Sequence, residues 1–305
     1  MKILANLKPG PLQQLHSDLI TQTKIELFVK REDLVDTELG GNKWRKLKYN
    51  IEAALNKNHH TLLTFGGAYS NHIYATAAAG KRLGLNTIGI IRGEKHTELN
   101  HTLEFATDCG MRLEYIDRTT YRRKNDADFI KHLHNEYGQF YLIPEGGSNT
   151  LALKGCAEIV DDINTSIGNK SFNTLCVASG TGATLAGLAS NISPQQTATG
   201  FAVLKGAEFL SKDVGNFLGQ SETTPETNWK INTDYHFGGY AKTNNELWNF
   251  IDTFNKEFNI PLDAVYTGKM FYGLFDLIKK RHFAEGTRIV AIHTGGLQGN
   301  KGFKR

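Results

Sequence analysis

The chain has 305 residues, of which 40% are apolar, with 17 Phe and 11 Tyr. This is enough apolar material to bury one large core or two linked cores, which excludes a disordered or fibrous protein. The 35 basic and 31 acidic residues are interleaved and leave a formal charge of only +4, so nucleic acid binding gets little support.

The first segment with chemical content is residues 29–49, VKREDLVDTELGGNKWRKLKY, where a polar stretch passes through a Gly-Gly pair into a helix. The helix is expected to begin at about Asn42, which puts Lys43 in its first turn. The helix dipole opposes a cation there by roughly 0.3 to 1 kcal/mol, and Schiff base chemistry would explain the lysine because it removes the charge. From this segment alone the favoured alternative is a solvated helix face of Lys43, Arg45, Lys46 and Lys48.

The clearest strand, turn and helix unit follows. Residues 61–65 predict a strand, 66–70 a turn, 71–83 a helix and 86–91 the next strand. Within the turn, FGGAYSNH places Ser70 and Asn71 where the helix begins. There they can present a hydroxyl, an amide and free N–H groups to a carboxylate, and helix capping is an equally good and compatible explanation.

The middle of the chain carries weaker signals. RTTYRRK at residues 118–124 surrounds a tyrosine with basic residues, and a solvated loop is the favoured interpretation. IPEGGSN at residues 143–149 alone predicts only a turn. Residues 162–173 and 219–233 look least ordered, and we interpret the second stretch as a surface excursion.

A second strand, turn and helix unit covers residues 174–190. Between the strand (174–178) and the helix (183–190) lies SGTGAT, whose N–H groups and hydroxyls can bind a phosphate at the positive end of a helix. The loop lacks the lysine of a nucleotide triphosphatase and the acidic partner of a dinucleotide site, so a smaller phosphate ligand fits better. A tight turn that needs small residues for packing remains the alternative.

A last predicted strand, residues 288–292, opens into the glycine-rich sequence HTGG. The alternation of strands, glycine turns and helices predicts an α/β fold with parallel sheets. Ligands of such sheets bind beyond the carboxyl ends of the strands, so the glycine turns mark where a site is expected.

Six strings occur together in order: GGNKWRKLKY, GGAYSNH, IPEGGSN, SGTGAT, AVYTGKMFYGL and HTGG. In order and spacing they resemble the family of 1-aminocyclopropane-1-carboxylate deaminases and D-cysteine desulfhydrases, over nearly the whole chain. The resemblance implies a tryptophan synthase β-like fold of two open parallel-sheet domains and the cofactor pyridoxal 5'-phosphate (PLP). It also implies a large domain of residues 1–45 with 165–305, a small domain of residues 46–164, and a homodimer.

The resemblance also assigns roles to residues. Lys43 would carry PLP as a Schiff base and, once freed, act as general base, while Asn71 would contact the cofactor's ring oxygen. Ser70, Asn71 and His72 would receive the substrate carboxylate, and Tyr240 and Tyr266 would line the active site as catalytic residues. The phosphate would be held by Gly180, Thr181, Gly182, Ala183 and Thr184, and Thr267 and Thr294 would complete the cofactor contacts.

Two positions favour the desulfhydrase branch, which converts D-cysteine to pyruvate, ammonia and hydrogen sulfide. The deaminases resemble VYEG and HLGG where this chain has Thr267 and Thr294. A threonine can hydrogen-bond the pyridine nitrogen but supplies no negative charge, which weakens the electron sink that opening of the cyclopropane ring is expected to need. His72 points the same way, since the deaminases tend to have glutamine there.

The chain also departs from the desulfhydrases, which read close to GGVQSNHTRQ where this chain has GGAYSNHIYAT. Tyr69, Ile73 and Tyr74 replace a glutamine, a threonine and an arginine, so the natural substrate can differ from D-cysteine. A deaminase of 1-aminocyclopropane-1-carboxylate, and a lyase or racemase of another D-amino acid, use the same Lys43. A PLP-binding protein without turnover is the non-enzyme alternative.

The expected location is the reducing cytoplasm. The chain has three widely separated cysteines, which suit neither a disulfide scaffold nor a zinc site. Its first residues, MKILANLKPGPLQQL, are too poor in apolar residues for a signal sequence, and no run of about 18 apolar residues predicts a membrane helix. The histidines show no ligand spacing, so no metal is expected.

Overall fold

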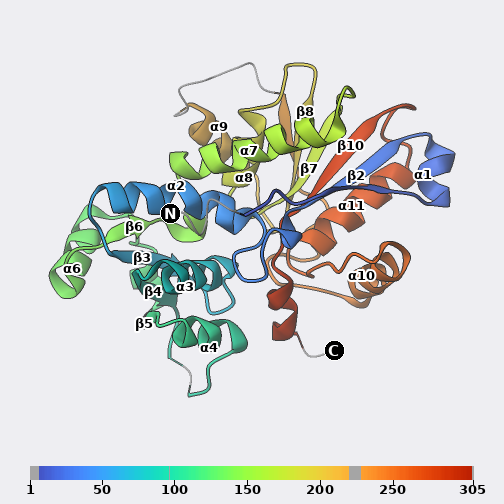
Figure 1. The fold of residues 1–305 in the computed structure, drawn as a ribbon. Helices are drawn as coiled ribbons and strands as arrows, with labels where there is room; N and C mark the ends of the chain where they lie inside the picture. Colours follow the sequence, from blue (N-terminus) through green and yellow to red (C-terminus); the bar gives the residue numbers. More distant parts are fainter. Residues whose placement is uncertain (1–6, 96, 220–227, 304–305) are drawn as a thin grey trace.

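The computed structural model describes residues 7–95, 97–219 and 228–303. It contains two sheets that lie side by side (Figure 1). In order across the larger sheet, the strands are β1 (Leu12–Leu15), β2 (Glu26–Arg31), β10 (Arg288–His293), β7 (Thr174–Ser179), β8 (Thr197–Ala202) and β9 (Trp229–Asn232). The smaller sheet has the order β5 (Arg112–Ile116), β4 (Asn86–Arg92), β3 (Thr61–Gly66) and β6 (Tyr141–Ile143). Apart from β1, which pairs antiparallel with β2, all described neighbours are parallel.

Helices cover both faces of the larger sheet because its central strands are apolar on both sides. In β7, Leu175 and Val177 pack with one set of helices and Cys176 and Ala178 with the other. The first set is α7 (Thr150–Ile167), α8 (Ala183–Ala189) and α9 (Phe209–Gly219). The second set is α1 (Asp18–Thr23), α10 (Asn245–Phe258) and α11 (Thr267–Lys279).

The smaller sheet is covered in the same way. Leu62 packs with α2 (Asn42–Asn56) and α3 (Asn71–Leu83), and the next residue, Leu63, packs on the side of α6 (Ala127–Tyr137). The remaining short elements are α4 (His101–Asp108), α5 (Arg118–Tyr121), η1 (Glu32–Leu34), η2 (Glu145–Gly147) and η3 (Leu297–Gly302). No helix in the described ranges is long and apolar enough to cross a bilayer.

The predicted α/β fold with parallel sheets is confirmed, and most predicted elements end within one residue of their predicted bounds. The prediction of little order at residues 162–173 is wrong for the first six, because α7 continues to Ile167. Of the expected excursion at 219–233, residues 220–227 lie outside the described residues, and Trp229–Asn232 is an edge strand. The division into two domains stays a prediction.

The segment RTTYRRK is more than a solvated loop. Asp117 caps the short helix α5, and Tyr121 is buried with only 3% of its surface exposed. Its hydroxyl donates to Glu145 at 2.8 Å, which ties α5 to the turn after β6.

Candidate active site

The carboxyl ends of both sheets open onto one cavity of about 600 Å³. The cavity wall includes the last residue of β4 and residues that follow strands β3, β6, β7, β8 and β10, as expected for parallel sheets. The glycine turns predicted from the sequence therefore do meet at one place.

The start of α2 is fixed against the end of β10. Gly41 has φ +76°, and a Cβ built on it would lie 1.9 Å from the carbonyl oxygen of Thr294, so only glycine fits. Asn42 donates from its backbone to the same carbonyl at 3.3 Å and from its side chain to Thr184 Oγ1 at 2.8 Å. These contacts direct the next residue, Lys43, into the cavity.

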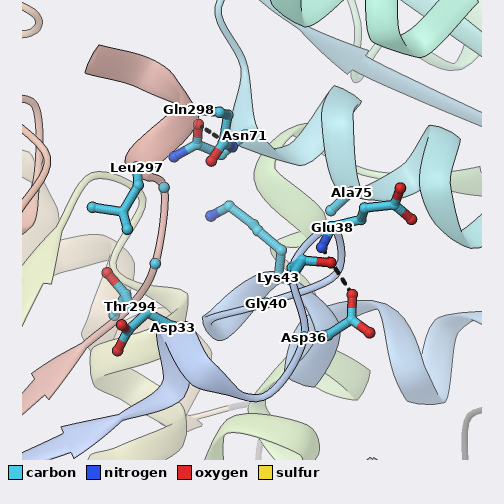
Figure 2. A pocket seen from close by; sticks show the side chains of 13 residues that line it. Asp33, Asp36, Glu38, Gly40, Lys43, Asn71, Ala75, Thr294, Leu297 and Gln298 are labelled. Atoms are coloured by element: carbon cyan, nitrogen blue, oxygen red, sulfur yellow. Dashed lines mark hydrogen bonds between the residues drawn. The ribbon is translucent and has the colours of Figure 1, made fainter. Parts of the chain in front are cut away.

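The side-chain ammonium group of Lys43 loses its proton more readily than that of an ordinary lysine. Its side chain extends between Asn71 on one side and Thr294 on the other, where a smaller hollow of about 70 Å³ adjoins it (Figure 2). Burial, together with the nearby ammonium of Lys46, lowers the pKa of Lys43 to about 7. At neutral pH a large fraction of this amine is therefore uncharged and nucleophilic.

Lys46 lies one helical turn beyond Lys43 and lines the same cavity. It is 2% exposed, and its contacts are long: 3.2 Å to the carbonyl of Gly146, 3.4 Å to Ser148 Oγ and 3.5 Å to Thr181 Oγ1. Burial lowers its pKa. A buried cation with neutral partners alone is suited to an anionic ligand.

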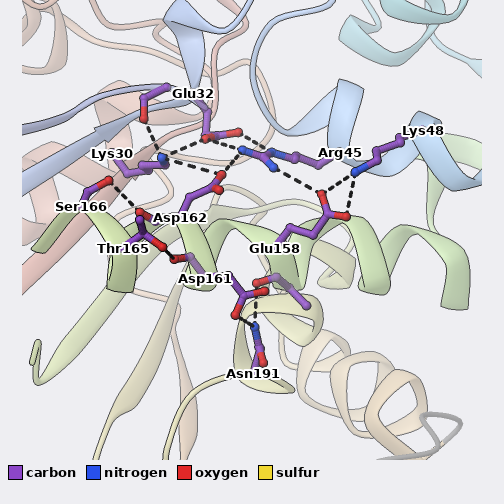
Figure 3. A network of polar contacts seen from close by, with 12 residues as sticks. Lys30, Glu32, Arg45, Lys48, Glu158, Asp161, Asp162, Thr165, Ser166 and Asn191 are labelled. Carbon is purple, nitrogen blue, oxygen red and sulfur yellow. Dashed lines mark hydrogen bonds and ion pairs between the residues drawn. The ribbon is translucent and has the colours of Figure 1, made fainter. Parts of the chain in front are cut away.

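Arg45 and Lys48 lie on the opposite side of α2, where both form ion pairs with carboxylates (Figure 3). Arg45 is bound through two nitrogens to Glu32, at 2.8 and 3.1 Å, and at 2.5 Å to Asp162 of α7. Lys48 donates to Glu158 of α7 at 2.7 Å. The prediction that the four basic residues form a solvated face is therefore wrong, because α7 covers one side of α2 and the cavity lies on the other.

The turn before α3 brings Ser70, Asn71 and His72 to the cavity wall. Ser70 caps α3 by accepting from Ile73 N at 3.3 Å, while no described residue bonds the backbone N–H groups of Asn71 and His72. The Asn71 side chain accepts from Gln298 at 2.9 Å. This helix start can bind a carboxylate through its free N–H groups.

The His72 ring is buried and neutral. Thr64 donates its hydroxyl proton to Ile143 O, so it must accept at 2.8 Å from His72 Nε2–H. Burial, and then the positive charges of Lys43 and Lys46, lower the His72 pKa well below 6.5. His72 Nδ1 is thus an acceptor, and no described residue donates to it. Only the backbone of His72 is suited to hold a carboxylate.

The loop between β7 and α8 is shaped for a ligand that approaches the backbone. Gly180, Thr181, Gly182 and Thr184 line the cavity, whereas Ala183 is fully buried and packs behind it. Gly182 has φ +77°, which favours glycine. Ser179 Oγ is buried at the same wall and has no partner among the described residues.

Tyr240 and Tyr266 form the next part of the wall. Tyr266 OH donates to Tyr240 OH at 3.3 Å, and the rings meet edge to face at 6.0 Å. Burial raises the pKa of Tyr266 well above its usual value, so it stays protonated at neutral pH. Buried Lys269 holds the backbone before Tyr240 by donating to the carbonyls of His236 (2.9 Å) and Gly239 (2.7 Å).

Thr267 and Thr294 differ in position. Thr294 lines the cavity, but Thr267 does not, since it lies behind Asp263. The Thr267 hydroxyl donates to Asp263 Oδ1 at 2.7 Å and accepts from Asp263 N at 2.9 Å. With its hydrogen-bonding capacity used in this way, the geometry gives no support to the predicted contact between Thr267 and a pyridine nitrogen.

Four charged residues that line the cavity were not predicted as site residues: Lys46, Arg92, Glu145 and Asp263. The sequence does contain a pattern that could have identified Lys46, because Lys46 lies three positions after Lys43 and therefore on the same face of the helix. Arg92 directly follows the predicted strand 86–91, and Glu145 lies within the predicted turn 143–149, so each lies in or beside a segment that could be placed from the sequence. Asp263 is explained structurally, since its carboxylate accepts from the backbone of Val265, Tyr266 and Thr267 and so caps α11.

Comparison with known proteins gives consistent results. Residues 4–295 match the model of a family described as pyridoxal-phosphate dependent enzymes. A protein of Pyrococcus horikoshii, provisionally named 1-aminocyclopropane-1-carboxylate deaminase, is 33% identical over 95% of this chain and 90% of its own length. The D-cysteine desulfhydrase of Serratia proteamaculans is 31% identical over 94% and 91%. The solved structure of an ACC deaminase homologue superposes with a TM-score of 0.82 at 30% identity, covering 98% of this chain and 94% of that one.

Proposed function

The chain belongs to the pyridoxal-phosphate dependent enzymes, and from that premise we propose that it is a lyase acting on a small amino acid. The reaction proposed first is conversion of D-cysteine and water to pyruvate, ammonium and hydrogen sulfide. The observation that carries the proposal is Lys43, a half-buried amine with a pKa of about 7 at the wall of a cavity that can hold cofactor and substrate together.

The cavity residues fit the cofactor. Lys46 and the loop of Gly180, Thr181 and Gly182 would hold its phosphate, because they combine a weakly paired cation with accessible backbone N–H groups. The unpartnered Ser179 Oγ and His72 Nδ1 are buried polar atoms of the kind that a ligand satisfies.

Pyridoxal phosphate, when bound, withdraws electrons from the α-carbon of an amino acid. The N–H groups at the start of α3, with the hydroxyl of Ser70, bind and orient the substrate carboxylate. The Lys43 amine takes the α-proton, since its lowered pKa keeps it in the basic form near pH 7. Tyr240, which accepts a hydrogen bond from Tyr266, keeps its own proton available for the departing β-substituent.

The competing function is deamination of 1-aminocyclopropane-1-carboxylate. A specific observation favours it, because the deaminase-named relative is slightly more similar to this chain than the desulfhydrase. The argument against it from Thr267 is weakened, since Asp263 places a carboxylate at the cavity wall where the sequence suggested only threonine. The same Lys43 would serve both reactions.

The test is an absorbance spectrum of purified protein loaded with pyridoxal phosphate, before and after borohydride, followed by assays with D-cysteine and with 1-aminocyclopropane-1-carboxylate. We expect a borohydride-sensitive band that Lys43→Ala lacks, and pyruvate with sulfide released from D-cysteine by the wild type alone. Release of 2-oxobutyrate from the cyclopropane amino acid instead would establish the competing function. Absence of any band would contradict both.

A further inference from the structure

Three cations line the described part of the cavity: Lys43, Lys46 and Arg92. The proposed function uses the first as a base and the second for the cofactor phosphate. The substrate α-carboxylate is served by the N–H groups of α3, which are uncharged. Arg92 is therefore a cation at the site without an assigned anion.

Arg92 is the last residue of β4, and its guanidinium turns toward the anion-binding turn before α3. Its Nη2 lies 3.6 Å from the position that a Cβ on Gly67 would occupy. The guanidinium lies over the ring of Tyr121, 5.6 Å from the centroid. No described residue accepts a hydrogen bond from it or pairs with it ionically, so its five donors are available to a ligand.

The carboxylate that accepts a hydrogen bond from Tyr121 has a second partner as well. Glu145 Oε1 accepts from Tyr121 OH at 2.8 Å, and Glu145 Oε2 lies 3.4 Å from Lys124 Nζ. Lys124 also lies over the Tyr121 ring, at 5.3 Å, but does not line the cavity. Two cations thus face one carboxylate around Tyr121, and the unpaired positive charge is the one at the cavity wall.

We propose that Arg92 binds a second anionic group of the substrate, so that the preferred substrate class is a β-substituted alanine whose leaving group carries a carboxylate. This inference rests on the proposed lyase function and names its substrate class. A guanidinium suits the role because its planar fork binds a carboxylate through two parallel hydrogen bonds.

The chemistry remains a simple elimination followed by hydrolysis. For a thioether substrate the Cβ–S bond breaks, the sulfur leaves with its electron pair and gains a proton, and the α-proton is removed. With one water the products are pyruvate, ammonium and a carboxylate-bearing thiol, so no oxidant or reductant is needed.

The probes are S-carboxymethylcysteine and S-propylcysteine, which have side chains of similar length with and without the carboxylate, each supplied as both enantiomers. The holoenzyme is titrated with each, and both the change in cofactor absorbance and the rate of pyruvate release are followed. The variants are Arg92→Gln, Arg92→Lys, and Lys124→Gln as the matched control, since it removes a cation from the same ring outside the cavity.

We expect the wild type to bind one enantiomer of the carboxymethyl compound more tightly than the propyl compound. Arg92→Gln should weaken that binding about 10- to 100-fold and leave the propyl compound within about twofold, because a charge-assisted hydrogen bond is lost. Arg92→Lys should be intermediate, and Lys124→Gln should match the wild type.

Equal weakening of both probes by Arg92→Gln would assign Arg92 to the α-carboxylate and overturn the proposal, as would no weakening of either. In both cases a normal cofactor band and turnover of D-cysteine would leave the proposed function intact. A protein without a cofactor band would overturn both.

Discussion

Helix α2 presents two pairs of cations on opposite sides, and they behave differently. Lys43 and Lys46 face the cavity with few or weak partners, whereas Arg45 and Lys48 are bound to carboxylates from η1 and α7. All four residues are basic, and they lie within the same six residues of the chain. The difference comes from what packs against each side, and it separates cations available for chemistry from cations that hold the helix in place.

The largest expected difference between the pairs is in amine reactivity. At pH 7 a lysine of pKa about 7 has a neutral fraction on the order of a thousandfold larger than an ordinary lysine of pKa about 10.4. We expect Lys43 of the cofactor-free protein to react with an amine reagent far faster than Lys48, with a rate that rises from pH 6 to 8 and then levels off. Mass spectrometry of labelled peptides measures this. Equal labelling of both lysines, or no protection of Lys43 by added pyridoxal phosphate, would contradict the expected difference in reactivity between Lys43 and Lys48.

Removal of Arg45 should have the largest effect on stability. Arg45→Met leaves the buried carboxylate of Glu32 and the partly buried carboxylate of Asp162 without their main partner, and breaking a buried pair in this way typically costs about 3 to 5 kcal/mol. Urea unfolding of the cofactor-free protein measures the loss. A loss below about 1 kcal/mol would mean that the ionic network does not hold α2 against α7.

Lys46→Met should weaken binding of the cofactor without lowering the stability of the fold. Its partners are neutral and distant, so the free energy of unfolding of the cofactor-free variant should stay the same or rise. Affinity for pyridoxal phosphate should fall about 10- to 100-fold, since a charge-assisted contact to the phosphate is lost. Equilibrium titration of the cofactor band gives the affinity, and Lys46→Arg provides a control that keeps the charge. Unchanged affinity in Lys46→Met would remove Lys46 from the phosphate site.

The smallest effect is expected at Lys48. Its pair with Glu158 is partly exposed to solvent, and such pairs contribute about 0 to 1 kcal/mol. Lys48→Met should therefore unfold at nearly the same urea concentration as the wild type and keep full cofactor affinity. A loss as large as that of Arg45→Met would show that the whole network acts as one unit.

Strand and helix periodicity and the glycine turns are local features, so the sequence predicted the α/β fold with parallel sheets. The family resemblance supplied the site residues, most of which line the cavity. The sequence could not separate the two sides of α2. That separation depends on Asp162, which is 117 positions from Arg45 in the chain and begins one of the two stretches that look least ordered in the sequence. It also could not place Thr267 behind Asp263, because both adjoin the same motif and only the start of α11 decides which one faces the cavity.

The cavity draws on parts of the chain that are synthesised far apart. Gln298 in η3 bonds Asn71 in α3 across 227 positions, and the carbonyl of Thr294 anchors the start of α2. Contacts between such distant residues cost loop-closure entropy, because a long stretch of chain must be brought together before they can form. A nascent chain that has not yet reached residue 294 therefore lacks a wall of the site. A ligand that binds only the native state stabilises that state alone. Bound cofactor is therefore expected to stabilise only those chains that already include residue 294.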